Sequence, residues 1–169
     1  MTASQPPARV VLLMGVAGAG KTTVGRALAA RLGWAFEDAD AYHSAAARET
    51  MARGRGLTDA DRAPWLARLA RLIRDRLASG PPTVLACSAL KAAYRRQLVG
   101  DAPGVLTAWL DASPELLARR LSEREGHIAG PDLLPSQLAA FEPPSGAVRL
   151  DAADAVDELV RALQQRLAP

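Results

Sequence analysis

The sequence is poor in aromatic residues and in cysteine, and it contains no long hydrophobic run. Aromatic residues make up 4% of its 169 residues, which leaves little material for the stacking platforms that bind single-stranded nucleic acid. The single cysteine, Cys87, excludes an intramolecular disulfide and is typical of a reducing cytoplasm. No apolar run approaches membrane-spanning length, and residues 1–8 lack the order of a signal peptide. We therefore expect a cytoplasmic protein with a flexible N-terminus over residues 1–8 and no membrane partner.

The apolar content is sufficient for one domain, which we expect to span residues 9–169. Hydrophobic residues make up 49% of the chain, enough for a central sheet with helices on both faces. The net charge is +3, and the basic residues are scattered along the sequence. This distribution argues against a nucleic-acid partner and fits a site that handles anions. We find no internal repeat, linker or low-complexity segment.

Residues 15–22 match the complete pattern of a phosphate-binding loop, G-x-x-x-x-G-K-[ST]. The apolar run 10–14 predicts a buried parallel strand before the loop. Apolar residues at every fourth position predict a helix after it, ended by Gly33. A glycine-rich turn that merely joins a strand to a helix is the alternative, and the Lys-Thr pair argues against it. We therefore expect a nucleoside triphosphate to bind here, through Gly15, Gly18, Ala19, Gly20, Lys21, Thr22 and Thr23.

The physical reason for this spacing is anion binding. The glycines allow the backbone to curl, so that its N–H groups point at the phosphates with the positive end of the helix dipole behind them. Lys21 adds a mobile charge, and the Thr22 hydroxyl is placed to bind Mg²⁺. ATP and Mg²⁺ are therefore the expected cofactors.

Strands and helices alternate along the rest of the chain. Strands are predicted at 34–36, 83–87, 105–110 and 147–150. Helices are predicted at 44–53, from a capping box at 58–61 to before Gly80, at 91–99, from 113, and from a cap at Asp154 with Val156, Leu159, Val160 and Leu163 facing inward. This order predicts an α/β fold with a doubly wound parallel sheet of about five strands. Such folds bind ligands at the carboxyl ends of their strands.

Three groups of polar residues follow predicted strands or the helices beside them. Asp38 and Asp40 are two apart in an extended segment, so both carboxylates can face the triphosphate, one near Mg²⁺ and one as a proton acceptor. A solvated acidic turn is the alternative. Ser88 and Lys91 can supply donors at the end of the third strand, where we expect Cys87 to pack as an apolar residue.

The third group is Arg120, Arg124 and His127. It lies where a predicted helix enters residues 126–135, a segment without periodicity. Its glycines and Pro131 predict a mobile lid over the phosphate site. Arg120 and Arg124 are four apart and share one helix face, where they could cover the adenine or neutralise the transferred phosphoryl group. Solvated helix charge is the alternative, because Arg119 and Arg120 are adjacent and only one of them can face the site.

On these residues the chain resembles the gluconate kinases of the phosphate-loop group, along residues 10–144. The loop is shared by a whole superfamily, whereas Asp-Arg-x-Pro-Trp-Leu at 61–66 and Cys-Ser-Ala-Leu-Lys at 87–91 are far more specific. Further matches are Asp38-Ala39-Asp40 with Tyr42-His43, Leu57 to Ala60, Tyr94-Arg95, Gly126-His127, Leu133-Leu134, Ser136-Gln137 and Glu142-Pro143.

The resemblance implies transfer of the ATP γ-phosphoryl group to D-gluconate, and it suggests a homodimer. It implies that Lys21 and Thr22 serve ATP-Mg²⁺ and that Asp40 is the base, with Asp38 at the metal and Arg124 also catalytic. Arg62 would bind the substrate carboxylate, for which a guanidinium fork is suited, with Trp65 as its structural support. The remaining substrate contacts would come from His43, Ser88, Lys91, His127 and Gln137, and Arg120 would contact the nucleotide.

The chain departs from the family pattern mainly on the substrate side. Residues that differ from the usual ones are Ser44, Ala47, Thr50, Gly56, Arg96 and Ile128. The loop and the expected base are retained, so kinase activity is expected, while the preference among sugar acids is left open. A shikimate-like kinase, a nucleoside monophosphate kinase and a nucleotide-binding module with degenerate catalysis are the competing interpretations. The lack of a Gly-Gly-Gly segment after the third strand argues against a shikimate-like kinase. Against the second, we find no base-reading contacts, and against the third stands the joint retention of Lys21, Thr22, Asp38, Asp40 and Arg62.

Overall fold

The computed structural model describes residues 7–123 and 131–168. Its strands are β1 (Val10–Met14), β2 (Ala35–Asp38), β3 (Thr83–Ala86), β4 (Val105–Asp111) and β5 (Val148–Asp151). Its helices are α1 (Lys21–Leu32), α2 (Ala45–Ala52), α3 (Asp59–Ala78), α4 (Ala92–Leu98), α5 (Pro114–Ser122), α6 (Leu134–Ala140) and α7 (Val156–Leu167), with 3₁₀ turns η1 (Ala39–Tyr42) and η2 (Pro131–Leu133).

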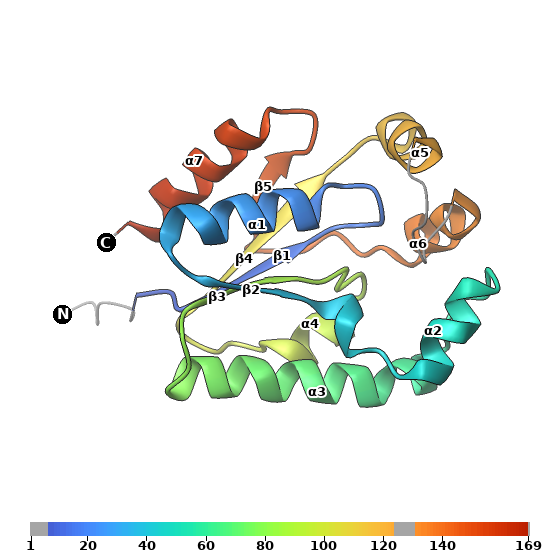
Figure 1. The fold of residues 1–169 in the computed structure, drawn as a ribbon, viewed down its shortest axis with the longest axis horizontal. Helices are drawn as coiled ribbons and strands as arrows, with labels where there is room; N and C mark the ends of the chain where they lie inside the picture. The colour runs from blue at the N-terminus through green and yellow to red at the C-terminus, as the bar shows by residue number, and fades with distance from the viewer. Residues whose placement is uncertain (1–6, 124–130, 169) are drawn as a thin grey trace.

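The five strands form one parallel sheet in the order β2-β3-β1-β4-β5. Side chains alternate along β1 between two cores, as the period of two in a strand requires. Val11 and Leu13 pack with α1 and α7, whereas Leu12 and Met14 pack with α3 and α4. Figure 1 shows these helix pairs on opposite sides of the sheet. The predicted doubly wound fold is therefore confirmed, and the carboxyl ends of all five strands lie at one edge.

Most local signals in the sequence produce the structure they predict. Gly33 ends α1 in the left-handed conformation (φ 67°), and its N–H reaches the carbonyls of Ala29 and Ala30. Thr58 and Asp61 form the reciprocal capping box that opens α3. These short-range hydrogen bonds fix where the helices on both faces of the sheet begin and end.

The main differences from the predicted elements lie at β2 and at the start of α7. Trp34 precedes β2, which runs on to Asp38. Asp154 does not cap α7, because the Asp151 carboxylate and carbonyl accept the N–H groups of Ala153 and Asp154 in a turn, and the cap is Ala155. Val156 therefore stands at the first position of α7, where it is 36% exposed instead of facing inward.

The predicted lid is helical where the structure describes it. Residues 126–130 lie outside the described ranges, as do Arg124 and His127. Residues 131–135 were predicted without periodic structure, but they form η2 and begin α6. Pro135 occupies the first turn of the helix, where a missing N–H costs nothing, and Leu133 and Leu134 are buried. Mobility of the lid stays a prediction.

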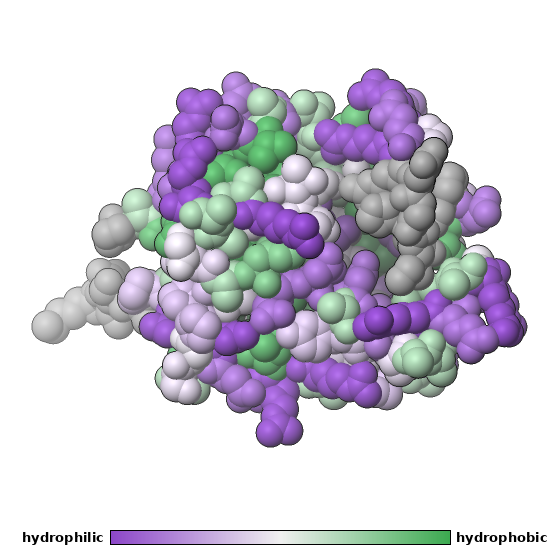
Figure 2. Space-filling model, viewed as in Figure 1, coloured by the Kyte–Doolittle hydropathy of each residue, from purple (hydrophilic) through white to green (hydrophobic). Residues whose placement is uncertain are grey.

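Hydrophilic side chains cover most of the face seen in Figure 2, and hydrophobic residues form small separate patches. Val156 is the one large hydrophobic residue counted as exposed in the part of the chain that the structure describes. A search of those residues finds no helix long and apolar enough to cross a membrane.

Candidate active site

A cavity of about 640 Å³ opens at the carboxyl edge of the sheet. Its walls come from the phosphate loop, from η1 and the residues after it, from α3 and α4, from the segment after β3, and from η2 and α6. The volume lies within the usual range for small-molecule sites. The sequence-predicted residues that line it are Gly18, Gly20, Lys21, Thr22, Thr23, Asp38, Asp40, His43, Arg62, Ser88 and Gln137.

The phosphate loop has the conformation that its glycines permit. Gly18 and Gly20 adopt φ values of 87° and 99°, which residues with a Cβ rarely adopt. Gly15 and Ala19 do not line the cavity. A Cβ on Gly15 would lie 3.0 Å from the Leu110 carbonyl oxygen, so close packing on β4 also requires glycine there.

The Thr22 hydroxyl lies 3.2 Å from the Asp38 carboxylate and donates to it. This pairing brings together the two oxygen donors that the sequence assigned to a metal. Asp38 also accepts the N–H of Asp40 at 3.0 Å, so it caps η1. The second carboxylate therefore enters the cavity from a 3₁₀ turn instead of the expected extended strand.

Magnesium fits this pair because it takes one or two protein oxygens and completes its shell with phosphate oxygens and water. Within residues 7–123 and 131–168, no cluster of three or more His, Cys, Asp or Glu side chains could hold a metal without such additional ligands. The Thr22 and Asp38 oxygens therefore fit a magnesium ion whose other ligands are phosphate oxygens and water.

The wall opposite the phosphate loop is built on α3. Trp65 is buried, donates from its ring nitrogen to the Ala39 carbonyl at 2.7 Å, and stacks on His43 with ring centroids 4.5 Å apart. It thus fixes η1 and His43, whereas Arg62, which it was expected to support, is held by other groups. Nη1 of Arg62 donates to the Leu57 carbonyl at 2.6 Å and to the Tyr94 hydroxyl at 3.4 Å.

His43 lines the cavity as a neutral side chain. It is 8% exposed, and its Nδ1 is buried without a hydrogen-bond partner among the described residues. Burial, with the positive charges of Arg62 and Arg48, lowers the pKa of His43 to about 4. The imidazole is therefore uncharged at neutral pH, with one ring nitrogen as a donor and the other as an acceptor.

This lowered pKa predicts an acid-sensitive fold. Between pH 6.5 and about 4 the unfolded chain binds a proton at His43 that the folded chain does not, so acidification through this window should reduce stability by about 3 kcal/mol. His43→Phe keeps a ring against Trp65 but cannot titrate. Urea unfolding at several pH values should therefore show a shallower acid loss in the variant. Parallel curves for the two proteins would contradict the buried neutral histidine.

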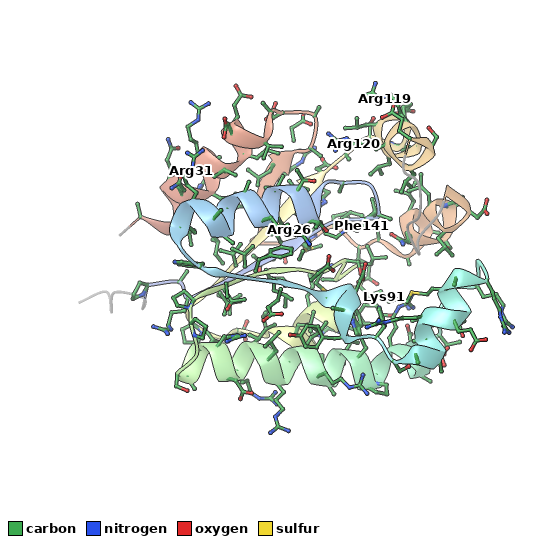
Figure 3. All side chains as sticks on the ribbon, viewed as in Figure 1. Arg26, Arg31, Lys91, Arg119, Arg120 and Phe141 are labelled. Carbon is green, nitrogen blue, oxygen red and sulfur yellow. The ribbon has the colours of Figure 1, made fainter. Side chains whose placement is uncertain are left out.

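Two predicted contact residues are held outside the cavity lining. Lys91 forms an ion pair with Asp59, with its Nζ 2.9 and 3.1 Å from the two carboxylate oxygens. Arg120 bonds the backbone carbonyls of the phosphate loop at Gly18 and Ala19, and also that of Ala152 at 2.7 Å. Figure 3 shows Arg120 turned from α5 toward the loop, with Arg119 turned away. Of the adjacent pair, Arg120 is therefore the one that contacts the phosphate loop.

Gln137 connects α6 to the phosphate loop. Its side-chain carbonyl oxygen accepts the N–H of Ala17 at 2.8 Å, and both residues line the cavity. The expected role of Gln137 was a substrate contact, whereas its contact in the structure is with a backbone donor of the loop. Displacement of this bond would free one more N–H group for a phosphate.

Ser88 enters the cavity on a strained segment after β3. The next residue, Ala89, has φ 45°, a conformation that costs a non-glycine residue energy. Arg95 stabilises the segment, because its Nη1 donates to the carbonyls of Ala89 and Leu90. Cys87 is buried, and burial raises its thiol pKa to about 12, which confirms packing over nucleophilic chemistry.

Arg26 and Tyr94 are among the lining residues to which sequence reasoning assigned no role. Arg26 lies one helical turn after Thr22, with its guanidinium 5.5 Å from the centre of the Phe36 ring. That i,i+4 spacing from the loop threonine could have revealed it. Tyr94 was matched only as part of a motif. Its role could not be inferred from the sequence because its partners, Asp59 and Arg62, come from α3.

The parallel sheet, the phosphate loop and the facing polar wall together define a phosphate-loop kinase for a small molecule. Residues 10–144 match the family described as an AAA domain. The chain is 51% identical to a gluconokinase of Gluconobacter oxydans over 136 residues, 80% of this chain and 76% of that protein. It is 45% identical to a probable gluconokinase of Mus musculus over 153 residues, 80% and 83% of the two chains. The chain belongs to the gluconokinase family.

Solved structures agree with this assignment. An unliganded sugar kinase from Janibacter sp. HTCC2649 superposes with a TM-score of 0.87 at 42% identity, covering 96% of this chain and 97% of that one. A gluconokinase from Sinorhizobium meliloti 1021 gives a TM-score of 0.82 at 39% identity, covering 97% and 93%. An APS kinase from Mycobacterium tuberculosis, at 20% identity and with a TM-score of 0.66 over 96% and 98% of the chains, shares the fold.

Proposed function

We propose that this protein transfers the γ-phosphoryl group of ATP to the terminal hydroxyl of D-gluconate, producing 6-phosphogluconate and ADP. The observation that carries the proposal is a single cavity lined by a phosphate loop and, from another element, by Arg62 and His43. Similarity to proteins named gluconokinase supports it. A cytoplasmic location, expected from the composition, and a homodimer, suggested by the resemblance, belong to the same proposal.

On the nucleotide side, the loop N–H groups and Lys21 would hold the β- and γ-phosphates. Thr22 and Asp38 would hold Mg²⁺, which neutralises charge on the phosphates when it is bound. Arg120 would act through the loop backbone that it fixes. These residues position the triphosphate and do not change covalently.

On the acceptor side, Arg62 would bind the carboxylate of gluconate through the guanidinium nitrogens that its backbone contact does not use. His43 and Ser88 would bond substrate hydroxyls. Asp40 would accept the proton of the terminal hydroxyl as its oxygen attacks the γ-phosphorus and the bond to ADP breaks. Placing these groups in one cavity provides the orientation that the reaction needs.

A coupled assay of ADP release across a panel of acceptors tests the proposed function. The panel includes D-gluconate, other sugar acids, shikimate and D-glucitol, the neutral counterpart with a hydroxymethyl group in place of the carboxylate. Turnover should be highest with D-gluconate and much lower with D-glucitol. Equal turnover of the neutral compound, or a clear preference for shikimate, would overturn the proposal.

Arg62→Ala should raise KM for gluconate and also lower kcat, because the substrate loses its charge-assisted anchor and its orientation. We expect a loss in kcat/KM of at least about 100-fold, as for a lost hydrogen bond to a charged group plus positioning. Arg71→Ala, an exposed arginine of α3 outside the cavity lining, is the matched control. Unchanged gluconate kinetics in Arg62→Ala would remove the carboxylate assignment.

A further inference from the structure

Arg62 belongs to a cluster of four side chains at the wall of the cavity, together with Asp59, Lys91 and Tyr94. Tyr94 is 8% exposed and donates its hydroxyl proton to the carboxylate of Asp59. Lys91 pairs with the same carboxylate. Both cations lie over the Tyr94 ring, the Arg62 carbon at 5.8 Å and the Lys91 nitrogen at 5.5 Å from its centre.

The hydrogen bonds in this cluster run in one direction. Bonds from Tyr94 and then from Lys91 hold the pKa of the Asp59 carboxyl below its usual value, so Asp59 is ionised and can only accept. The Tyr94 hydroxyl must therefore give its proton to Asp59. Its oxygen lone pairs are then left to accept from Nη1 of Arg62. The aromatic ring adds a cation–π attraction for the same guanidinium.

Lys91 gives the cluster its charge balance. Arg62 lies one turn after Asp59 on α3. Without Lys91, the ionised Asp59 would attract the Arg62 guanidinium and draw it away from the cavity. The Lys91 ammonium occupies both oxygens of Asp59 instead. Arg62 then keeps its positive charge for the cavity, and its Nη1 stays fixed between the Leu57 carbonyl and the Tyr94 hydroxyl.

We propose that Tyr94, held by Asp59 and Lys91, is a positioning residue that fixes the Arg62 guanidinium and so sets the preference of the cavity for an acidic acceptor. This inference rests on the proposed function and adds residues to it. It also gives Lys91 a role outside the cavity lining, since Lys91 holds the Asp59 carboxylate that in turn holds Tyr94. The arrangement joins the start of α3 to the start of α4 around one functional arginine.

Tyr94→Phe tests the proposal, with Tyr42→Phe as a matched control. Tyr42 is the other tyrosine of the chain and also donates to a carboxylate, that of Glu37 at 2.8 Å, but it does not line the cavity. In Tyr94→Phe, KM for gluconate should rise about three- to tenfold, as for one lost hydrogen bond. KM for ATP and kcat at saturating gluconate should stay within about twofold. The preference for gluconate over D-glucitol should fall by the same factor as kcat/KM for gluconate.

Asp59→Asn and the combined variant distinguish positioning from direct contact. Asp59→Asn should raise KM for gluconate because Tyr94 loses its partner. The double variant should therefore lose about as much in kcat/KM for gluconate as Tyr94→Phe alone. Additive losses, an equal rise in KM for ATP, or an unchanged preference in Tyr94→Phe would each overturn the proposal. The melting temperatures of the two tyrosine variants, Asp59→Asn and the double variant show whether any loss of activity comes from unfolding. Failure of the proposed function would look different, because the wild-type protein would then lack a preference for the acid.

Discussion

Lys21→Ala is expected to lower kcat by at least about 100-fold while leaving the fold intact. Lys21 belongs to the phosphate loop, begins α1 and lines the cavity, with its Nζ 3.0 Å from the Val16 carbonyl oxygen. From this place its charge can follow the phosphates as negative charge shifts toward ADP. A preorganised donor of this kind contributes most in the transition state, so the loss should be larger in kcat than in KM. Steady-state kinetics with saturating ATP measure the effect.

Two comparisons make the Lys21 result interpretable. Arg31→Ala removes a cation from the other end of α1, where it pairs with Asp157 on the surface, and should leave kcat unchanged. Circular dichroism and thermal melting should be close to wild type for both variants. Near-normal turnover in folded Lys21→Ala would show that the loop does not serve phosphoryl transfer in the proposed way.

The parts of the fold that could be predicted from sequence are those fixed by neighbouring residues. The strand, loop and helix over residues 10–32 form one contiguous motif, and their apolar spacing and glycines determine them locally. The capping box at Thr58 likewise needs only three residues of context. These predictions succeed because each partner lies within a turn or two of the other.

Long-range contacts of predicted residues could not be read from the sequence. Lys91 was expected to contact substrate, but Asp59, 32 residues away, forms an ion pair with it. Trp65 was expected to support Arg62, but its ring nitrogen finds the Ala39 carbonyl, 26 residues away. Sequence alone placed Lys91 after the third strand and Trp65 on the helix that follows the capping box. It could not rank the groups competing for their hydrogen bonds, since that ranking depends on how α3 packs against the sheet.

The same distinction explains the error at residues 131–135. The lack of periodicity, the glycines before this segment and Pro131 favoured a loop. Burial of Leu133 and Leu134 instead draws it into η2 and the first turn of α6, where Pro135 is tolerated. Tertiary packing thus overrode a local signal. It also placed Gln137 next to the Ala17 N–H, a contact 120 residues apart in sequence.

Asp40→Asn should lower kcat by about 100- to 10,000-fold while gluconate still binds, because the amide keeps the size of the carboxylate but cannot accept the hydroxyl proton. Equilibrium binding of gluconate by calorimetry, beside kcat from the ADP-release assay, separates the two effects. Asp38→Asn is the matched control, since this neighbouring carboxylate lies 3.2 Å from the Thr22 hydroxyl and should alter the Mg²⁺ concentration needed for half-maximal rate. If Asp40→Asn loses gluconate binding while its kcat stays within a few-fold of wild type, Asp40 binds the acceptor and another group takes the proton. A large fall in kcat with binding retained would place the base in η1, directly after β2, where Asp40 lines the same cavity as the phosphate loop.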